Sequence, residues 1–173
     1  MASYPYGKDV VVKWIREKFP ADSTVLDVGP CDACWKRLLP EYENMDAVEI
    51  FEPNVEQCRP FYRNIWNADI AEFEYGHYDL IILADVLEHM DVPTAQKVLR
   101  YAWDRCDDLI VALPFQLKQD AIYGNPWELH VQDDLTPAIV RERYPELEIL
   151  HEAGWCYCYY HKGVRNEKGT EII

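Results

Sequence analysis

Basic residues are scarce in this sequence. It has 17 Lys and Arg against 31 Asp and Glu, which gives a formal net charge of −14 at pH 7. The positive residues stand singly or in pairs, as at Lys36 and Arg37, and they form no basic patch. An acidic surface repels phosphate backbones, and binding to nucleic acid needs local positive charge. We therefore expect no nucleic-acid partner.

Long apolar runs are also missing. The first residues, MASYPYGKDVVVKW, contain no apolar stretch of the kind found in secretory signals. No later run approaches the ~20 apolar residues that a membrane-spanning helix needs. We expect a cytoplasmic protein that does not contact membranes. In that compartment the six cysteines should be reduced; they are Cys31, Cys34, Cys58, Cys106, Cys156 and Cys158.

The length and composition of the chain suit one globular domain. The chain has 173 residues, 49% of them hydrophobic, which is enough for a single substantial core. Apolar periodicity predicts helices at residues 9–19, 30–39, 53–59, 93–106 and 135–144. Strands are predicted at residues 25–28, 45–50, 61–66, 78–84, 109–113, 147–151 and 155–161.

This alternation of strands and helices predicts the fold class. It indicates a single-domain, doubly wound, Rossmann-like α/β fold with a mostly parallel sheet. The last two of the seven expected strands form a C-terminal antiparallel hairpin. We assign residues 1–162 to the domain and residues 163–173 to a polar tail. Residues 115–133 lack a clear period, and a loop of that length in a compact domain is often functional.

The turn after the first strand lacks a phosphate-binding glycine pattern. Residues 25–39 read VLDVGPCDACWKRLL, a buried strand that ends in Asp-x-Gly and opens into a helix. A dinucleotide needs G-x-G-x-x-G here, but Cys31 and Cys34 replace the second and third glycines. Pro30 also removes one amide donor from the turn. NAD or FAD is therefore disfavoured.

Acidic residues instead follow the strands. Glu49 lies twenty positions after Gly29, where a carboxylate can accept hydrogen bonds from both ribose hydroxyls. Ile50 can cover one face of an adenine, and Asp69 can accept a hydrogen bond from the adenine amine. Asp27 and Asp85 close the first and fourth strands, so we expect both in the same crevice. Four acidic groups at strand ends suit a cationic ligand better than a polyphosphate.

Four segments in order carry a resemblance to a known family. They are VLDVG, VEI, NADI and YDLIILADVLEHM, and together they resemble the class I S-adenosylmethionine-dependent methyltransferases of the small-molecule type. The resemblance spans residues 4–162. It implies S-adenosylmethionine as the cofactor and S-adenosylhomocysteine as the product. The cofactor-binding residues that we assign, from the resemblance and from the strand ends, are Asp27, Gly29, Cys31, Glu49, Ile50, Asp69, Ile70 and Asp85.

The opening loop departs from the pattern of that family. The family usually shows G-x-G-x-G, whereas this sequence has Gly29-Pro30-Cys31-Asp32-Ala33. The Cys31 side chain is expected to narrow the pocket for the methionine part of the cofactor.

Candidates for catalysis lie after the fourth strand and in the long loop. An oxygen or nitrogen nucleophile can need a general base, and the candidates are His89, Glu88 and His130. His89 can instead fix a loop by bonding to backbone, and His130 can instead belong to a solvated turn. Tyr4 and Tyr6 are candidate lid residues. The Cys31-x-x-Cys34 spacing is that of half a zinc site, but it coincides with the cofactor loop, so we expect no metal site.

The sequence therefore predicts a methyltransferase that acts on a small molecule or metabolite, at oxygen or nitrogen. A non-catalytic S-adenosylmethionine-binding module is the alternative, followed by an NAD-dependent oxidoreductase. The acceptor and the oligomeric state are left open.

Overall fold

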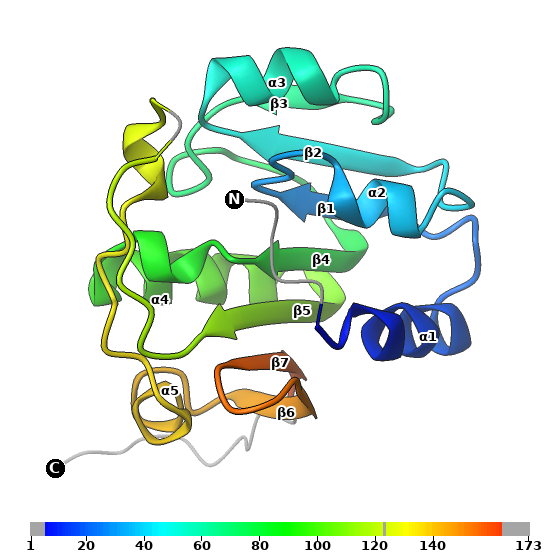
Figure 1. Cartoon of the computed structure of the whole chain (residues 1–173). Helices are drawn as coiled ribbons and strands as arrows, with labels where there is room; N and C mark the ends of the chain where they lie inside the picture. Colours follow the sequence, from blue (N-terminus) through cyan, green and yellow to red (C-terminus); the bar gives the residue numbers. More distant parts are fainter. Residues whose placement is uncertain (1–5, 123, 164–173) are drawn as a thin grey trace, which may run out of the picture.

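The protein contains a seven-stranded sheet. A computed structural model describes residues 6–122 and 124–163, in which the strand order is β3-β2-β1-β4-β5-β7-β6 (Figure 1). The strands are β1 (Val25–Val28), β2 (Met45–Glu49), β3 (Ile65–Asn67), β4 (Tyr78–Ala84), β5 (Cys106–Pro114), β6 (Leu147–Glu152) and β7 (Tyr157–Lys162). The number of strands and the fold class agree with the prediction.

Strands β1 to β5 are parallel, and β7 and β6 are antiparallel additions. Strand β7 pairs with β5, so the second strand of the hairpin is inserted between β5 and β6. The predicted C-terminal hairpin is thus confirmed, and its second strand lies inside the sheet.

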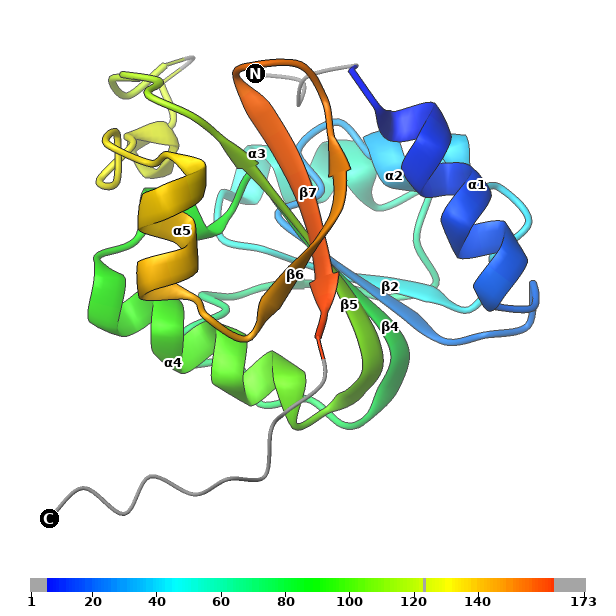
Figure 2. The same cartoon turned by 90° about the horizontal axis from the view of Figure 1, so that it is seen from below.

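Helices cover both faces of the sheet (Figure 2). They are α1 (Lys8–Lys18), α2 (Cys34–Leu38), α3 (Glu52–Cys58), α4 (Val92–Trp103) and α5 (Pro137–Arg143), with short 3₁₀ helices η1 (Leu87–His89) and η2 (Pro126–Glu128). Helix α4 begins where the sequence predicts, because the Asp91 carboxylate accepts a hydrogen bond from the Thr94 amide and a proline occupies the first turn. No helix in the described residues is long and apolar enough to cross a membrane.

The core has two layers that the sheet separates. On one face, Ile81 and Leu83 of β4 pack with the apolar side of α4 and with Val140 of α5. On the other face, Leu80 and Ile82 pack with the apolar side of α1. Neighbouring side chains in a strand point to opposite faces, so a strand covered on both faces is apolar throughout. That is why β4 has the bounds that the sequence predicts.

The third strand is shorter than predicted and lies later in the chain. Strand β3 spans Ile65–Asn67, whereas the sequence indicated residues 61–66. The Phe61 amide instead bonds to the Cys58 carbonyl, which continues the turn at the end of α3 past Pro60. The Arg63 amide and the Asn64 carbonyl still bond to the backbone of β2, but the regular strand begins only at Ile65, so the predicted strand at residues 61–64 was wrong.

The carboxyl ends of the parallel strands meet on one side of the molecule. The order changes direction at β1 and β4, since the chain runs outward to β3 and then returns to β4 and β5. Residues 115–122 and 124–133, together called the 115–133 loop below, run past the ends of these strands (yellow-green to yellow in Figure 1). Ligands of open α/β sheets bind at such a change of direction.

Candidate functional site

A cavity of about 320 Å³ lies at this edge of the sheet. Its wall is formed by the ends of β1, β2 and β4, by η1, and by the 115–133 loop. This volume is within the range of small-molecule and cofactor sites. Most of the predicted cofactor residues line it, namely Gly29, Cys31, Glu49, Ile50, Asp69, Ile70 and Asp85, together with His89 and His130.

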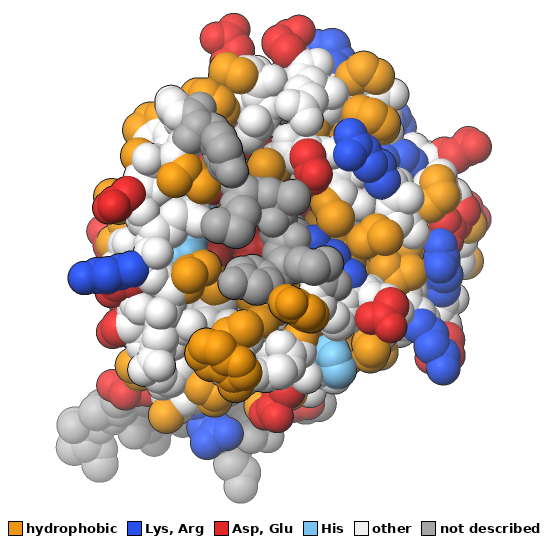
Figure 3. All heavy atoms as spheres, viewed as in Figure 1, with side chains coloured by type: hydrophobic (Ala, Val, Ile, Leu, Met, Phe, Trp, Pro, Cys, Tyr) orange, Lys and Arg blue, Asp and Glu red, His pale blue; other side chains and the backbone are white. Residues whose placement is uncertain are grey.

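The charge of the cavity wall has one sign. Seven carboxylates line it, and no Lys or Arg occurs among the lining residues that the structure describes. The acidic residues are Asp32, Glu49, Asp69, Asp85, Glu88, Asp91 and Glu128. On this face of the molecule, Lys and Arg gather mostly toward α1 and α2 (Figure 3). Such a wall attracts a cation and disfavours a phosphate chain.

The loop after β1 has the backbone of a glycine-rich turn, but only the first of its three glycine positions is a glycine. Gly29, Cys31 and Ala33 have φ values of 65°, 51° and 62°, in the left-handed region. These are the three positions of a G-x-G-x-G pattern. A residue with a side chain costs about 1–2 kcal/mol in this conformation, so the loop at Cys31 and Ala33 is strained. Burial raises the pKa of the Cys31 thiol to about 11, so the thiol is neutral.

Glu49 is held in place at the end of β2. One carboxylate oxygen accepts a hydrogen bond from the Phe51 amide at 2.9 Å, and the other accepts one from Asn54 Nδ2 at 3.2 Å. The side chain is buried, and burial raises the pKa of its carboxyl group, which these hydrogen bonds partly offset. The Cys31 backbone also hydrogen-bonds to this carboxylate and likewise lowers its pKa. A carboxylate has about four lone-pair sites, so it keeps acceptor capacity for a ligand.

Asp69 and Ile70 lie beside Glu49 on the cavity wall. One Asp69 oxygen accepts a hydrogen bond from the Ala71 amide at 2.8 Å, and the side chain is otherwise exposed. Ile70 is buried in the core layer that contains α4. With Ile50, these residues form an apolar slot that has a hydrogen-bond acceptor at its edge.

Asp27 is not part of the cavity wall. Its side chain is 1% exposed and accepts a hydrogen bond of 2.5 Å from the Tyr62 hydroxyl. Burial raises its pKa to about 7. The structure therefore does not bring Asp27 into the crevice as predicted: the Asp27 side chain contacts Tyr62, whereas Val28, which alternation places on the opposite face of β1, lines the cavity.

Asp85 does reach the cavity, directly after β4. Its φ of 57° is in the left-handed region, and one oxygen accepts a hydrogen bond of 2.6 Å from the Tyr157 hydroxyl. Tyr157 lies on β7, which is the neighbour of β5 in the sheet. No local sequence pattern predicts this contact, since it depends on the insertion of β7 between β5 and β6.

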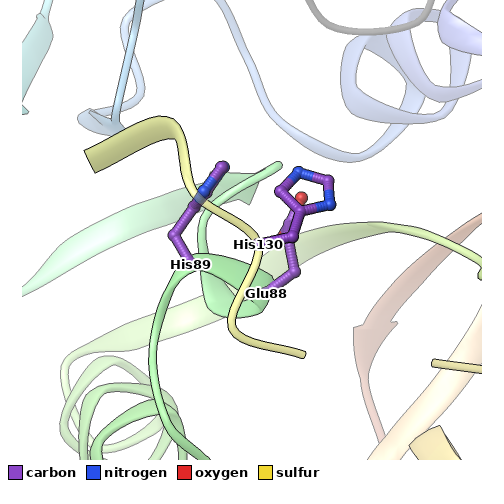
Figure 4. Close-up of side chains that lie close together, drawn as sticks. All are labelled: Glu88, His89 and His130. Atoms are coloured by element: carbon purple, nitrogen blue, oxygen red, sulfur yellow. The ribbon is translucent and has the colours of Figure 1, made fainter. Parts of the chain in front are cut away.

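His89 and His130 meet across the cavity, one from η1 and one from the 115–133 loop (Figure 4). Their ring centroids are 4.8 Å apart. His89 Nδ1 lies 3.1 Å from the Leu129 carbonyl, and His130 Nδ1 lies 2.8 Å from the Leu117 carbonyl. Each Nδ1 therefore donates its hydrogen, which leaves Nε2 as an acceptor. Burial lowers the pKa of both imidazoles, for His89 with help from His130, so both rings are neutral near pH 7.

Glu88 lies under the two histidines. Its side chain is 0% exposed, and neither carboxylate oxygen has a hydrogen-bond partner among the described residues. Burial, and then the nearby charge of Asp85, raise the pKa of Glu88 well above its ordinary value. Glu88, His89 and His130 each offer one ligand atom within 4.8 Å of the others. The sequence indicated Glu88 as a candidate beside the two histidines.

Gln132 attaches the 115–133 loop to η1. Its side-chain amide donates to the carbonyls of Leu87 and Met90, at 2.8 and 3.1 Å. The backbone amides of Val131 and Gln132 both bond to the Glu88 carbonyl. These contacts hold the two histidines at a constant separation, and no pattern in the sequence marked Gln132.

The remaining candidates lie elsewhere. Tyr6 is 59% exposed and is not among the lining residues, while Tyr4 is outside the described residues, as are residues 164–173 of the tail. The open side of the cavity is instead lined by the 115–133 loop, through Leu117, Gln119, Asn125, Trp127 and Glu128. All six cysteines are free, and none belongs to the cluster of possible metal ligands in the described residues.

The structure is similar to solved structures of S-adenosylmethionine-dependent methyltransferases. The magnesium protoporphyrin IX methyltransferase of Synechocystis, solved with bound S-adenosylmethionine, has a TM-score of 0.60 and 18% identity, over 88% of this chain and 76% of that chain. A methyltransferase from Clostridium acetobutylicum has a TM-score of 0.70 and 12% identity, over 94% and 93%. The N-methyltransferase NodS from Bradyrhizobium japonicum has a TM-score of 0.61 and 13% identity, over 94% and 98%.

These similarities establish the fold. No protein-family model matches the sequence, and no curated protein is similar to it at the level of sequence. The chain has the fold that these methyltransferases share, which confirms the resemblance at the level of structure.

Proposed function

We propose that this protein is an S-adenosylmethionine-dependent methyltransferase that acts on a small molecule or metabolite. One observation carries the proposal: in a methyltransferase fold, the cavity at the change of strand direction is lined by seven carboxylates and by no described Lys or Arg. The sulfonium of S-adenosylmethionine is a cation, and the cofactor has no phosphate. The wall therefore suits this cofactor and opposes NAD or FAD.

The cofactor is placed by the residues that line the cavity. The free lone pairs of Glu49 accept hydrogen bonds from the ribose hydroxyls, and Ile50 and Ile70 contact the adenine. Asp69 accepts a hydrogen bond from the adenine amine. The strained loop at Gly29 and Cys31 faces the methionine part, and the sulfonium lies near Asp85. Asp27 has no direct contact in this arrangement, because it is buried behind the wall.

The reaction requires mainly alignment. The acceptor atom approaches the methyl carbon opposite the carbon–sulfur bond, and a wall that fixes both reactants supplies most of the rate. His89 and His130 are neutral, and each has an Nε2 lone pair, so either can accept the proton of an acceptor hydroxyl or amine. The 115–133 loop, with Leu117, Asn125 and Trp127, forms the acceptor side.

The proposal extends to the domain, the compartment and the class of acceptor. Residues 1–162 act as one methyltransferase domain, and the cytoplasm is the proposed compartment. The acidic balance of the chain opposes a nucleic-acid acceptor.

A non-catalytic S-adenosylmethionine-binding module is the second candidate. The strained loop at Cys31 favours it, since a side chain replaces the usual glycine next to the methionine pocket. This candidate predicts binding without transfer of the methyl group.

Calorimetry separates these candidates. We expect S-adenosylhomocysteine to bind the full chain and NAD⁺ to produce no heat of binding. An intact protein that binds NAD⁺ and ignores S-adenosylhomocysteine would overturn the proposal. Transfer of a labelled methyl group to any member of a metabolite panel supports the enzyme, whereas binding with no transfer across the panel favours the module.

A further inference from the structure

Three side chains at the acceptor end of the cavity have the chemistry of a metal site. We propose that Glu88, His89 and His130 bind one divalent transition-metal ion. One nitrogen or oxygen atom from each residue lies within 4.8 Å of the other two (Figure 4). The sequence led us to expect no metal, because only the cysteine spacing indicated one.

The carboxylate of Glu88 needs a positive partner. It is 0% exposed, and neither oxygen has a hydrogen-bond partner among the described residues. An isolated buried carboxylate is very costly, so it must hold a proton or face a cation. Asp85 and Glu128 also line this part of the cavity and add negative charge, which a divalent ion compensates better than one proton.

The two histidines are oriented as metal ligands are. Each Nδ1 is hydrogen-bonded to a backbone carbonyl, that of Leu129 for His89 and that of Leu117 for His130. Histidines that bind metals usually donate their other ring nitrogen in this way, which fixes the tautomer and the ring. The Nε2 atom of each ring is therefore the one available to a metal.

The ligand set and the spacing fit an open site. Two imidazoles and one carboxylate hold catalytic Zn²⁺ in several enzymes, with a fourth position free for water or substrate. In a tetrahedral site, two ligand atoms that each lie ~2.1 Å from the ion are about 3.4 Å apart. The ligand atoms here lie within 4.8 Å of one another, so binding would close a pair by up to about 1.4 Å, or about 0.7 Å for each atom.

A metal ion at this end of the cavity would bind the acceptor and activate it. This role rests on the proposed methyltransferase function and narrows the acceptor to a molecule with a hydroxyl group that binds the ion. With both Nε2 atoms on the ion, the histidines would act as ligands, and this role replaces that of a general base. The metal would lower the pKa of the bound hydroxyl, which would lose its proton to solvent water. The oxygen then forms a bond to the methyl carbon of the sulfonium, and the electron pair of the carbon–sulfur bond goes to sulfur, which becomes a neutral thioether.

Binding of Mn²⁺ tests the site directly. Mn²⁺ prefers carboxylate and other oxygen ligands over thiolates, so the six free cysteines compete little. The full chain is dialysed against a chelator, returned to chelator-free buffer and titrated with Mn²⁺ by calorimetry. We expect one ion per chain. Glu88→Gln keeps the volume but removes the charge, and His130→Gln removes one imidazole; each should weaken binding at least about tenfold.

His77→Asn is the matched control. His77 is an exposed surface histidine beside Asp107, outside the cavity, so its loss should leave Mn²⁺ binding unchanged. The affinity for S-adenosylhomocysteine is measured on the same samples. Absence of Mn²⁺ binding in a chain that binds S-adenosylhomocysteine would overturn the metal site alone, as would Mn²⁺ binding that survives both cavity substitutions. Mn²⁺ binding that these substitutions abolish, in a chain that ignores S-adenosylhomocysteine, supports the metal site and contradicts the methyltransferase proposal.

Discussion

The buried carboxylates of this protein differ in the hydrogen-bond partners that offset the cost of their burial. Asp46 is 2% exposed, but it accepts hydrogen bonds from Arg63, Asn64 and Tyr78, and these partners lower its pKa despite the cost of burial. Asp27 and Glu88 are equally buried, and burial raises the pKa of both. A carboxylate with such partners stabilises the fold, whereas one without them near a cavity indicates a binding function.

Glu49 gives the most direct test at the scale of one residue. We expect Glu49→Ala to weaken the binding of S-adenosylhomocysteine by about 1–3 kcal/mol, the usual cost of losing a charged hydrogen-bond acceptor. Calorimetry measures the affinity, and circular dichroism shows that the variant is folded. Glu52→Ala, at an exposed position in the first turn of α3, is the control and should bind normally. An unchanged affinity in Glu49→Ala would mean that the ribose is held elsewhere.

Asp27 predicts a pH dependence of stability. Its pKa is about 7 in the folded protein, against an ordinary value of 3.8. Between these values the folded state holds a proton that the unfolded state lacks, so its contribution to the free energy of unfolding falls as pH rises. The free energy of unfolding of Asp27→Asn, relative to that of the unmodified protein, should therefore increase by about 2 kcal/mol from about pH 5 to about pH 8. Denaturant unfolding at the two pH values measures this change, and a difference independent of pH would contradict it.

Elements with strong local signals were predictable from the sequence, and long-range arrangements were not. The bounds of β1 and β4 follow from short apolar runs that end at turns. Strand β3 begins later than predicted because the turn after α3 extends to Phe61. The insertion of β7 depends on pairing with β5, which no local pattern encodes. The same holds for the site. The positions of Glu49 and Asp69 could be predicted because they follow strands, whereas the contact of Tyr157 with Asp85 could not.

The turn between β1 and α2 gives a prediction at the scale of the element. Cys31 has a φ of 51°, which glycine adopts without strain, and its side chain lines the cavity. We expect Cys31→Gly to bind S-adenosylhomocysteine more tightly by a few fold, because the strain is removed and the pocket for the methionine part widens. Calorimetry on both proteins measures the ratio. Cys156→Ala, at a half-buried position outside the cavity wall, is the control. Weaker binding in Cys31→Gly would show that the side chain contacts the ligand.

At the scale of the whole molecule, charge is the dominant property. The net charge of −14 and the seven carboxylates in the cavity attract a cation over some distance. S-adenosylmethionine carries the sulfonium charge, and S-adenosylhomocysteine does not. Salt should therefore weaken the binding of the first more than that of the second, by about threefold between about 0.05 and about 0.5 M. Parallel titrations of the two ligands at both salt concentrations measure this difference, and equal salt dependence would contradict the electrostatic role of the wall.

The central claim is that the cavity at the change of strand direction holds S-adenosylmethionine. The most direct test is a crystal structure of the full chain with S-adenosylhomocysteine. We predict that the ribose hydroxyls donate to Glu49, that the adenine lies between Ile50 and Ile70, and that the sulfur lies on the side of Asp85, facing Glu88, His89 and His130. An empty cavity at saturating S-adenosylhomocysteine, or a ligand bound outside this cavity, would contradict the claim.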